Sequence, residues 1–350
     1  MLKYYFGATR FSIVSPDSTS WRLSRKEGVA DAQNYTERLF SDERLGPRVQ
    51  IFCELAAPIY QQMADRHHYR HFVYYSPQLP DKWLTELQAA AEKYPVLELV
   101  AVNSDRVGNV ARMQKVLVEA APGDDALVFA FRVDDDDLLS ADYLDQVEQY
   151  MLPEHDGFGV SLAEGYVGLF EHGGYSVLRH YNQAMSSMGQ GAIGRWISST
   201  GTLEINEIRN HRRTPKMRTV LLNAQRPSVI QTRHIQQDTA TDDGHMNGDP
   251  DVIRREILTK MGRHAVVEDT EQLFTQFPTL RGLYTAAEDA KVSTDAEQAA
   301  SDAKAAEAGN AAAGVGRASV GQSATSRLAV ARRRLRRRVG TMARRIGLRR

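Results

Sequence analysis

The chain has 350 residues, of which 42% are hydrophobic, so a wholly disordered protein is excluded. Its 44 basic and 44 acidic residues cancel, but segment 327–350 holds 11 arginines and no acid, which leaves 33 basic against 44 acidic residues elsewhere. The single cysteine, Cys53, excludes an internal disulfide and a cysteine-rich metal site, and it suits a reducing, cytoplasmic compartment.

The N-terminal residues contain no apolar core of signal-peptide length. No run of about 18 apolar residues occurs anywhere in the chain, so we expect no membrane-spanning helix.

The first half of the chain alternates short apolar runs with helical patterns. We expect strands at 11–14, 71–75, 96–102 and 127–133, and helices at 54–66, 81–92, 111–121 and 141–151. Strands separated by helices favour parallel pairing with right-handed crossovers. This order predicts a layered α/β architecture.

The second half is less regular. We expect strands within 157–174 and extended segments at 193–204 and 228–235, which together form a mixed sheet and an acceptor side. Segment 286–326 is rich in alanine and poor in large apolar residues, so it is predicted to be a helical or disordered linker. The predicted organisation is a domain at 1–285, this linker, and a basic tail at 327–350.

Four adjacent aspartates, Asp134, Asp135, Asp136 and Asp137, directly follow the predicted strand 127–133. In α/β sheets ligands bind beyond the carboxyl ends of the strands. Adjacent carboxylates repel one another unless they share a cation, and oxygen ligands suit Mg²⁺ or Mn²⁺. Such a cation neutralises charge on a diphosphate leaving group, so the pattern predicts a nucleotide-diphosphate site. A solvated acidic loop before the next helix is the alternative.

A calcium loop of the EF-hand type does not fit these aspartates. With Asp134 as the first ligand, the fifth and sixth positions are Leu138 and Leu139, and the twelfth is Asp145 rather than glutamate.

Segment 134–144 resembles the Asp-x-Asp-Asp region of type-A-fold glycosyltransferases, in which a similar Ala-Asp-Tyr-Leu pattern opens the next helix. Upstream, Asn103, Gly108, Ala111 and Arg112 resemble the segment that precedes that region. With 9–13 and 75–80, these residues look like the rhamnosyltransferase family of bacteria, over 9–280 by order of elements. The sequence departs from the commonest pattern at Met113, where asparagine often follows Ala-Arg.

The resemblance implies a type-A nucleotide-sugar-binding fold with a mixed central sheet and a disordered or helical C-terminal tail. It also implies a glycosyltransferase that depends on Mn²⁺ or Mg²⁺. Asp134 would contact the ribose or the metal, Asp136 would be the main metal ligand, and Asp137 would orient the acceptor or the metal shell. Asp135, Arg10 and Arg112 would lie at the nucleotide sugar, although Arg112 reads equally well as a surface helix residue.

The same family often supplies one more metal ligand from a late segment, and His234 after the extended segment 228–235 is the candidate; a structural histidine is the alternative. The catalytic base is left open between Glu164 and Glu204, with Glu171 also near. Trp196 could stack on a sugar ring. The polar segment 238–250 could close over the nucleotide or be a plain surface loop.

The basic tail carries an apolar stripe. Leu335, Val339, Met342 and Ile346 recur at helical spacing among the arginines, which favours binding to an anionic membrane surface. A nucleic-acid arm is disfavoured because no aromatic residue follows Tyr284, and a solvated tail is the third alternative.

Three functions follow from these patterns. The first is transfer of a sugar, with rhamnose as the candidate, from a nucleoside diphosphate to a cell-envelope glycan or lipid-linked acceptor at the inner face of the plasma membrane. The second is another metal-dependent nucleotidyltransferase, and the third is a non-catalytic peripheral membrane-binding protein. The segment 103–112 favours the first.

Overall fold

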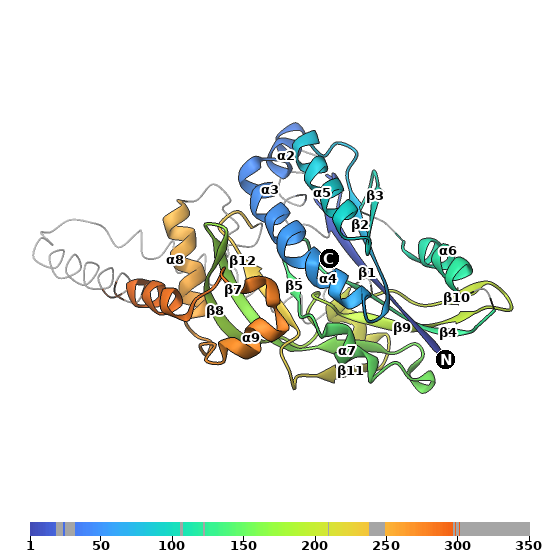
Figure 1. The fold of residues 1–350 in the computed structure, drawn as a ribbon. Coiled ribbons are helices and arrows are strands. Elements are labelled where there is room, and N and C mark those ends of the chain that lie inside the picture. Colours follow the sequence, from blue (N-terminus) through green and yellow to red (C-terminus); the bar gives the residue numbers. More distant parts are fainter. Residues whose placement is uncertain are drawn as a thin grey trace, which may run out of the picture. The chain divides into compact units, whose positions relative to one another are not determined.

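The structure is a computed structural model that describes residues 1–18, 24, 32–105, 108–121, 123–208, 210–237, 249–296, 298 and 301. The chain divides into two compact units, 1–296 and 297–350, and the elements below belong to the first (Figure 1). The predicted tail 327–350, most of the predicted linker and segment 238–248 lie outside the described residues. No helix of the described residues is long and apolar enough to cross a membrane.

The first unit is built around a mixed sheet whose centre is parallel. β1 pairs in parallel with both β2 and β4, and β9 runs antiparallel to β4. The strand order is β11 (Val220–Asn223), β6 (Gly159–Leu162), β9 (Gly191–Ile197), β4 (Ala126–Arg132), β1 (Leu2–Phe11), β2 (His68–Tyr75) and β3 (Leu97–Ala101), with β10 (Thr202–Glu204) on β9. The predicted α/β class with a mixed central sheet is confirmed.

The first strand was predicted too late in the chain. β1 occupies Leu2–Phe11 rather than 11–14 because its alternating tyrosines, phenylalanine, glycine and alanine are buried on both faces, a pattern that a search for aliphatic runs misses. The two strands β8 (Gly174–Asn182) and β11 were also not predicted separately. The predicted strands 71–75, 96–102 and 127–133 correspond to β2, β3 and β4 within a few residues.

One long helical stretch covers one face of the central sheet. It consists of α3 (Asp42–Val49), the π-helical segment η1 (Gln50–Ala56) and α4 (Ala57–Ala64), seen as the long blue helix in Figure 1. With α5 (Asp81–Lys93) it packs on Tyr5, Phe129 and Phe131. The helix α6 (Val110–Ala120) packs on the opposite face, against Phe6 and Phe72. The sheet is therefore covered on both faces, as its apolar strands require.

A second, smaller sheet brings the late part of the chain back to the aspartates. Its order is β5 (Leu138–Leu139), β12 (Val229–Arg233), β7 (Glu164–Glu171) and β8. β12 runs antiparallel to β5, with Ile230 opposite Leu138. Because the two chains run in opposite directions, each step beyond Ile230 matches a step back from Leu138, and the end of β12 returns to the aspartates. The helix α8 (Pro250–Met261) packs on β7 and β8. The described residues of the unit also form three short helices and three 3-10 turns, which are α2 (Ala32–Leu39), α7 (Tyr143–Glu148), α9 (Thr270–Gln276), η2 (Pro153–His155), η3 (His211–Lys216) and η4 (Pro278–Leu280).

The start of the predicted linker packs on the first unit. Residues 286–296 are helical, and Asp289 is only 2% exposed. Its carboxylate pairs with Arg179 at 2.7 Å and accepts a hydrogen bond from the Leu178 backbone N–H at 2.9 Å. Asp289 therefore ties the first residues of the predicted linker to the first unit through a buried cationic partner that the sequence did not reveal.

Candidate functional site

The four aspartates lie where the central strands end. β4 ends at Arg132, and the chain then remains tied to β1: the Val133 N–H donates to the Ala8 carbonyl at 3.1 Å, and the Thr9 hydroxyl donates to the Val133 carbonyl at 3.1 Å. These bonds fix the first aspartate beside the carboxyl end of β1. The cluster therefore occupies the edge of the sheet at which α/β proteins bind ligands.

Arg48 is the counterion of the two central aspartates. Its guanidinium donates to Asp135 Oδ1, and Nη2 lies 2.8 Å from Asp136 Oδ2. The side chains are nearly withdrawn from solvent, with exposed fractions of 4% for Asp135 and 6% for Asp136. Arg48 comes from α3, so the helix over the sheet face reaches the strand ends. Sequence reasoning missed this residue because nothing in the local pattern marks it.

The pKa values of the central aspartates diverge. Burial raises the pKa of Asp135 to about 6, because Arg48 offsets only part of the desolvation and Asp136 adds repulsion. Burial also opposes ionisation of Asp136, but Arg48, His234 and Gln237 together hold its pKa below the usual value. Asp136 is therefore the carboxylate that stays ionised.

His234 lies against Asp136. Its Nε2 is 3.5 Å from Asp136 Oδ2, and Gln237 Nε2 donates to the same oxygen at 3.0 Å. His234 is 2% exposed, and within the described residues neither ring nitrogen has a hydrogen-bond partner. Burial lowers its pKa, which favours the neutral imidazole that can bind a metal. The structure thus places His234, the candidate for one more metal ligand, beside Asp136, and it adds Gln237, which the sequence analysis missed.

Asp137 faces inward. Its Oδ1 accepts a hydrogen bond from the Thr232 backbone N–H at 3.0 Å, and the side chain is 6% exposed. Burial and the neighbouring carboxylates, Asp136 first, raise the pKa of Asp137 well above its usual range. The residue therefore fastens β12 two positions before His234, and its expected role in orienting the acceptor or the metal shell stays a prediction.

A second group of polar side chains lies at the ends of β1 and β3. Asp105 accepts hydrogen bonds from the Ser15 hydroxyl at 2.8 Å and the Ser18 hydroxyl at 2.6 Å, and Arg10 Nη1 lies 3.9 Å from it. Burial lowers the pKa of Arg10, as does Arg132, whereas Asp134, Asp105 and Asp135 raise it, so Arg10 lies in the field of the cluster as predicted. Asp105 was missed, although it lies inside segment 103–112.

The turn after β1 has an unusual backbone. Ser12 has φ 46°, a left-handed conformation that a non-glycine residue seldom adopts. Its buried hydroxyl accepts a hydrogen bond from Arg44 Nη1 at 3.0 Å, which holds the turn in place. The turn directs the following residues, Ser15 and Ser18, toward Asp105. Non-glycine residues in this conformation often mark ligand sites, since surrounding contacts must support the strain.

Arg112 and Glu164 lie outside the cluster, and their expected roles at the nucleotide sugar and as catalytic base stay predictions. Arg112 extends from α6 and pairs with Glu98 on β3, at the outer part of the sheet. Glu164 opens β7 and lies 3.6 Å from His180, whereas β7 reaches the level of Thr232 only at Gly168. Four residues of an extended strand separate Glu164 from Gly168, so Glu164 lies about 13 Å along β7 from the level of Thr232.

Glu204 and Trp196 also lie away from the cluster. Glu204 pairs across β10 and β9 with Arg195, which is opposite Leu127 near the start of β4, so it lies at the other end of that strand from the aspartates. Trp196 is 1% exposed and donates its ring N–H to the Ala121 carbonyl at 3.2 Å. It is a core residue and presents no face to a sugar.

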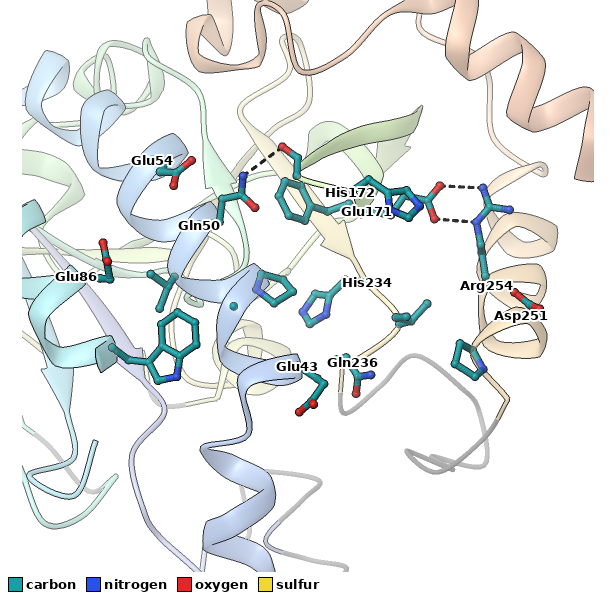
Figure 2. A pocket seen from close by; sticks show the side chains of 18 residues that line it. Glu43, Gln50, Glu54, Glu86, Glu171, His172, His234, Gln236, Asp251 and Arg254 are labelled. Carbon is teal, nitrogen blue, oxygen red and sulfur yellow. Dashed lines mark hydrogen bonds and ion pairs between the residues drawn. The ribbon is translucent and has the colours of Figure 1, made fainter. Parts of the chain in front are cut away.

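A large cavity is lined by His234, by the helical stretch over the central sheet and by the end of β7 (Figure 2). Its volume is about 1000 Å³, and its walls come from α3, η1, α5, the β7–β8 turn, the end of β12 and the start of α8. Glu171, at the end of β7, lines it and forms two hydrogen bonds with Arg254, at 2.7 and 2.8 Å. Of the three glutamates considered as the catalytic base, Glu171 is therefore the one that lines the same cavity as His234.

One other group of metal-ligating side chains occurs within the described ranges. His67, Asp145 and Glu148 bring their ligand atoms within 4.8 Å of one another. They lie at the amino ends of the central strands, and each acid already has a cationic partner, Lys3 at 3.1 Å from Glu148 and Arg66 at 3.2 Å from Asp145. The protein's own cations thus neutralise this group.

The sequence of this chain matches one protein family over more than half of its length. Residues 5–245 match the family described as "Putative rhamnosyl transferase". No curated protein matches the sequence.

Several solved structures resemble the chain remotely. S. aureus TarS 1–349 in complex with UDP-GlcNAc is 10% identical, with 78% of this chain and 69% of that chain covered and a TM-score of 0.30. The mannosyltransferase PcManGT from Pyrobaculum calidifontis, in complex with GDP-Man and Mn²⁺, is 14% identical, with 89% and 80% covered and a TM-score of 0.29. A 4-diphosphocytidyl-2C-methyl-D-erythritol synthase is 12% identical, with 64% of this chain and 89% of that chain covered and a TM-score of 0.26.

Proposed function

Because the chain belongs to the family described as putative rhamnosyl transferases, we propose that it is a metal-dependent glycosyltransferase that moves a sugar, rhamnose in the first instance, from a nucleoside diphosphate to a cell-envelope glycan or lipid-linked acceptor. The observation that carries the proposal is a buried histidine without a hydrogen-bond partner among the described residues, 3.5 Å from an ionised aspartate at the strand ends.

The donor set fits a divalent cation. Asp136 and His234 offer a carboxylate and a neutral imidazole side by side, and Asp135 Oδ2 is a further buried oxygen without a partner in the described part of the chain. Asp134 is half-buried beside them. We propose that Asp134, Asp136 and His234 hold Mn²⁺ or Mg²⁺, which would neutralise charge on the leaving diphosphate. Arg48 keeps Asp135 and Asp136 compensated within the protein.

The nucleotide is proposed to lie on the side of Arg10 and Asp105. Asp105 can accept hydrogen bonds from ribose or base, and Arg10 can donate to phosphate oxygens. Ser15 and Ser18 hold the Asp105 carboxylate in place at 2.8 and 2.6 Å. These residues would orient the donor so that its anomeric carbon faces the cavity beside His234.

Transfer requires a balanced exchange at the anomeric carbon. The acceptor hydroxyl oxygen bonds to that carbon while the bond to the diphosphate oxygen breaks, and the nucleoside diphosphate leaves with the bonding pair. The hydroxyl proton passes to a carboxylate. Glu171 is our candidate in place of Glu164 and Glu204. Burial opposes its ionisation, but the hydrogen bonds from Arg254 hold the pKa of Glu171 below its usual value, so it is ionised at neutral pH.

The test is nucleotide binding with and without metal. A nucleoside diphosphate at about 100 times its dissociation constant should stabilise the fold by about 2.7 kcal/mol, seen as a rise in melting temperature that requires Mn²⁺. Asp136→Ala should remove that rise and leave the circular dichroism spectrum unchanged. If the variant binds nucleotide and turns over donor like the wild type, the metal assignment is wrong.

Product identity separates this function from the alternatives. A glycosyltransferase releases nucleoside diphosphate, whereas a nucleotidyltransferase releases pyrophosphate. A non-catalytic binding protein would release neither from a sugar nucleotide.

We also propose that the tail 327–350 attaches the protein to the anionic inner face of the plasma membrane, which its 11 arginines without an acid support. In this view 1–285 with the helix at 286–296 is the catalytic body and the remainder to 326 is a linker. Full-length protein should bind anionic vesicles at low salt and release them at high salt, and protein ending at Gly314 should not bind. Equal binding by both would refute the proposal.

A further inference from the structure

The cavity beside His234 has features of a ligand site that the aspartates alone do not supply. Its volume of about 1000 Å³ is at the upper end of small-molecule pockets. None of its lining residues comes from the Arg10 and Asp105 group, so it is separate from the nucleotide side. We propose that this cavity binds the acceptor sugar, and that the acceptor sugar is uncharged or carries an amine, not a phosphate or carboxylate. This rests on the proposed function.

The first support is His234 itself. It lines the cavity, and Figure 2 shows it in the middle of the side chains that surround the space. It is 2% exposed, and within the described residues neither ring nitrogen has a hydrogen-bond partner. A buried polar group of this kind costs folding free energy unless a ligand satisfies it. Since the same ring lies 3.5 Å from Asp136, a ligand in the cavity would sit next to the reacting centre.

The second support is the charge of the walls. Five carboxylates line the cavity, and its one arginine, Arg254, is already bound to Glu171. The other four have no ion pair with any described residue; they are Glu43, Glu54, Glu86 and Asp251. Carboxylates around a concave surface concentrate negative potential. An anionic group entering this space would be repelled, whereas sugar hydroxyls and ammonium groups can donate hydrogen bonds to it.

The third support is the local helix geometry. The cavity wall includes Gln50 and Glu54, which belong to η1, the π-helical segment. π-helical turns inside α-helices are frequent at functional sites because they displace side chains from the α-helical register. Gln50 donates to the Gly173 carbonyl at 3.3 Å across the cavity edge (Figure 2), which ties the helix to the β7–β8 turn. Trp83 and Phe170, both largely buried, complete the aromatic part of the lining.

The experiment compares three glucose derivatives of different charge: one neutral, one with an amine and one with a phosphate. Methyl glucoside, methyl 2-amino-2-deoxyglucoside and glucose 6-phosphate are each titrated into full-length protein with Mn²⁺ and UDP present, and binding is followed by saturation-transfer NMR. We expect binding of the first two, and about tenfold weaker binding of the phosphate, because the four carboxylates without an ion pair among the described residues, all solvent-exposed, lie along the cavity walls.

The charge argument is then tested by substitution. The double variant Glu54→Gln, Glu86→Gln removes two of the four unpaired carboxylates and keeps their shape. It should reduce the preference for methyl glucoside over glucose 6-phosphate about tenfold. The matched control is Glu92→Gln, Glu119→Gln, which removes two exposed acids outside the cavity and should leave that preference unchanged.

Several results would overturn the inference. These are equal binding of the phosphate and the neutral glycoside to wild-type protein, no binding of any glycoside, or an unchanged preference in the double variant. A protein that binds these glycosides but shows no metal-dependent binding of nucleotide would instead count against the proposed function. The two failures are therefore distinguishable.

Discussion

Replacing Arg48 with methionine tests how the buried aspartates are compensated. Arg48 is 2.8 Å from Asp136 and also contacts Asp135, and both carboxylates are at most 6% exposed. Methionine keeps much of the volume and removes the charge, so two buried carboxylates lose their counterion. Breaking a buried pair from one side costs about 3–5 kcal/mol. For a domain of this size that lowers the melting temperature by roughly 10 °C.

The assay is thermal unfolding followed by circular dichroism, first in EDTA and then in Mn²⁺. Because Mn²⁺ would supply the missing positive charge, it should raise the melting temperature of Arg48→Met more than that of the wild type. The control is Arg281→Met, since the pair of Arg281 with Glu271 at 3.3 Å is exposed, and its loss should cost less than about 1 kcal/mol. If the variant does not fold, Arg48→Lys keeps a charge and allows the same comparison. A melting temperature of Arg48→Met in EDTA within about 2 °C of that of the wild type would refute the reasoning.

Three further predictions concern the core. Burial lowers the pKa of His71 to about 3. Below about pH 6.5 the unfolded chain therefore binds a proton at this histidine that the folded protein does not bind. The contribution of His71 to the free energy of unfolding is complete above about pH 6.5 and decreases toward about pH 3. Between pH 7.5 and 5, urea unfolding of wild type should lose about 2 kcal/mol more than His71→Gln, and an equal loss would contradict this. Gly165→Ala places a Cβ 2.4 Å from the Val229 carbonyl oxygen, and should cost about 1–3 kcal/mol by forcing β7 from β12; an unchanged melting temperature would disprove the clash. Trp196→Ala should cost about 3–5 kcal/mol in urea unfolding, and a loss below 1 kcal/mol would show that the ring is not in the core.

The sequence was most informative where local patterns decide structure. The helix predicted at 81–92 is α5, Asp81–Lys93, because its apolar residues recur at helical spacing. The aspartates could be placed at a strand end because a continuous apolar run, buried on both faces, precedes them. The position of His234 at the end of a strand could also be predicted, because it follows a short β-rich segment.

The remaining site residues depend on contacts between distant segments. Arg48 meets Asp135 across 87 positions, and no periodicity within α3 indicates that partner. Glu204 was chosen for its place beside Trp196, but the antiparallel pairing of β9 with β4 carries both to the far end of the strand. Glu171, rather than Glu164, lies at the end of β7 that is beside the end of β12, because the two strands pair in parallel. Local sequence does not reveal this pairing direction.

The long helix over the sheet face belongs to both halves of the proposed site. Arg48 reaches the aspartates from α3, whereas Gln50 and Glu54 face the cavity from η1, a few positions later. A π-helical turn closes its hydrogen bonds from i to i+5 rather than from i to i+4, so it takes in more residues than an α-helical turn. The helices on its two sides can therefore keep the phase of one continuous helix, while the segment between them presents its side chains in different directions. The wide turn thus allows Gln50 and Glu54 to face the cavity without turning Arg48 away from the aspartates.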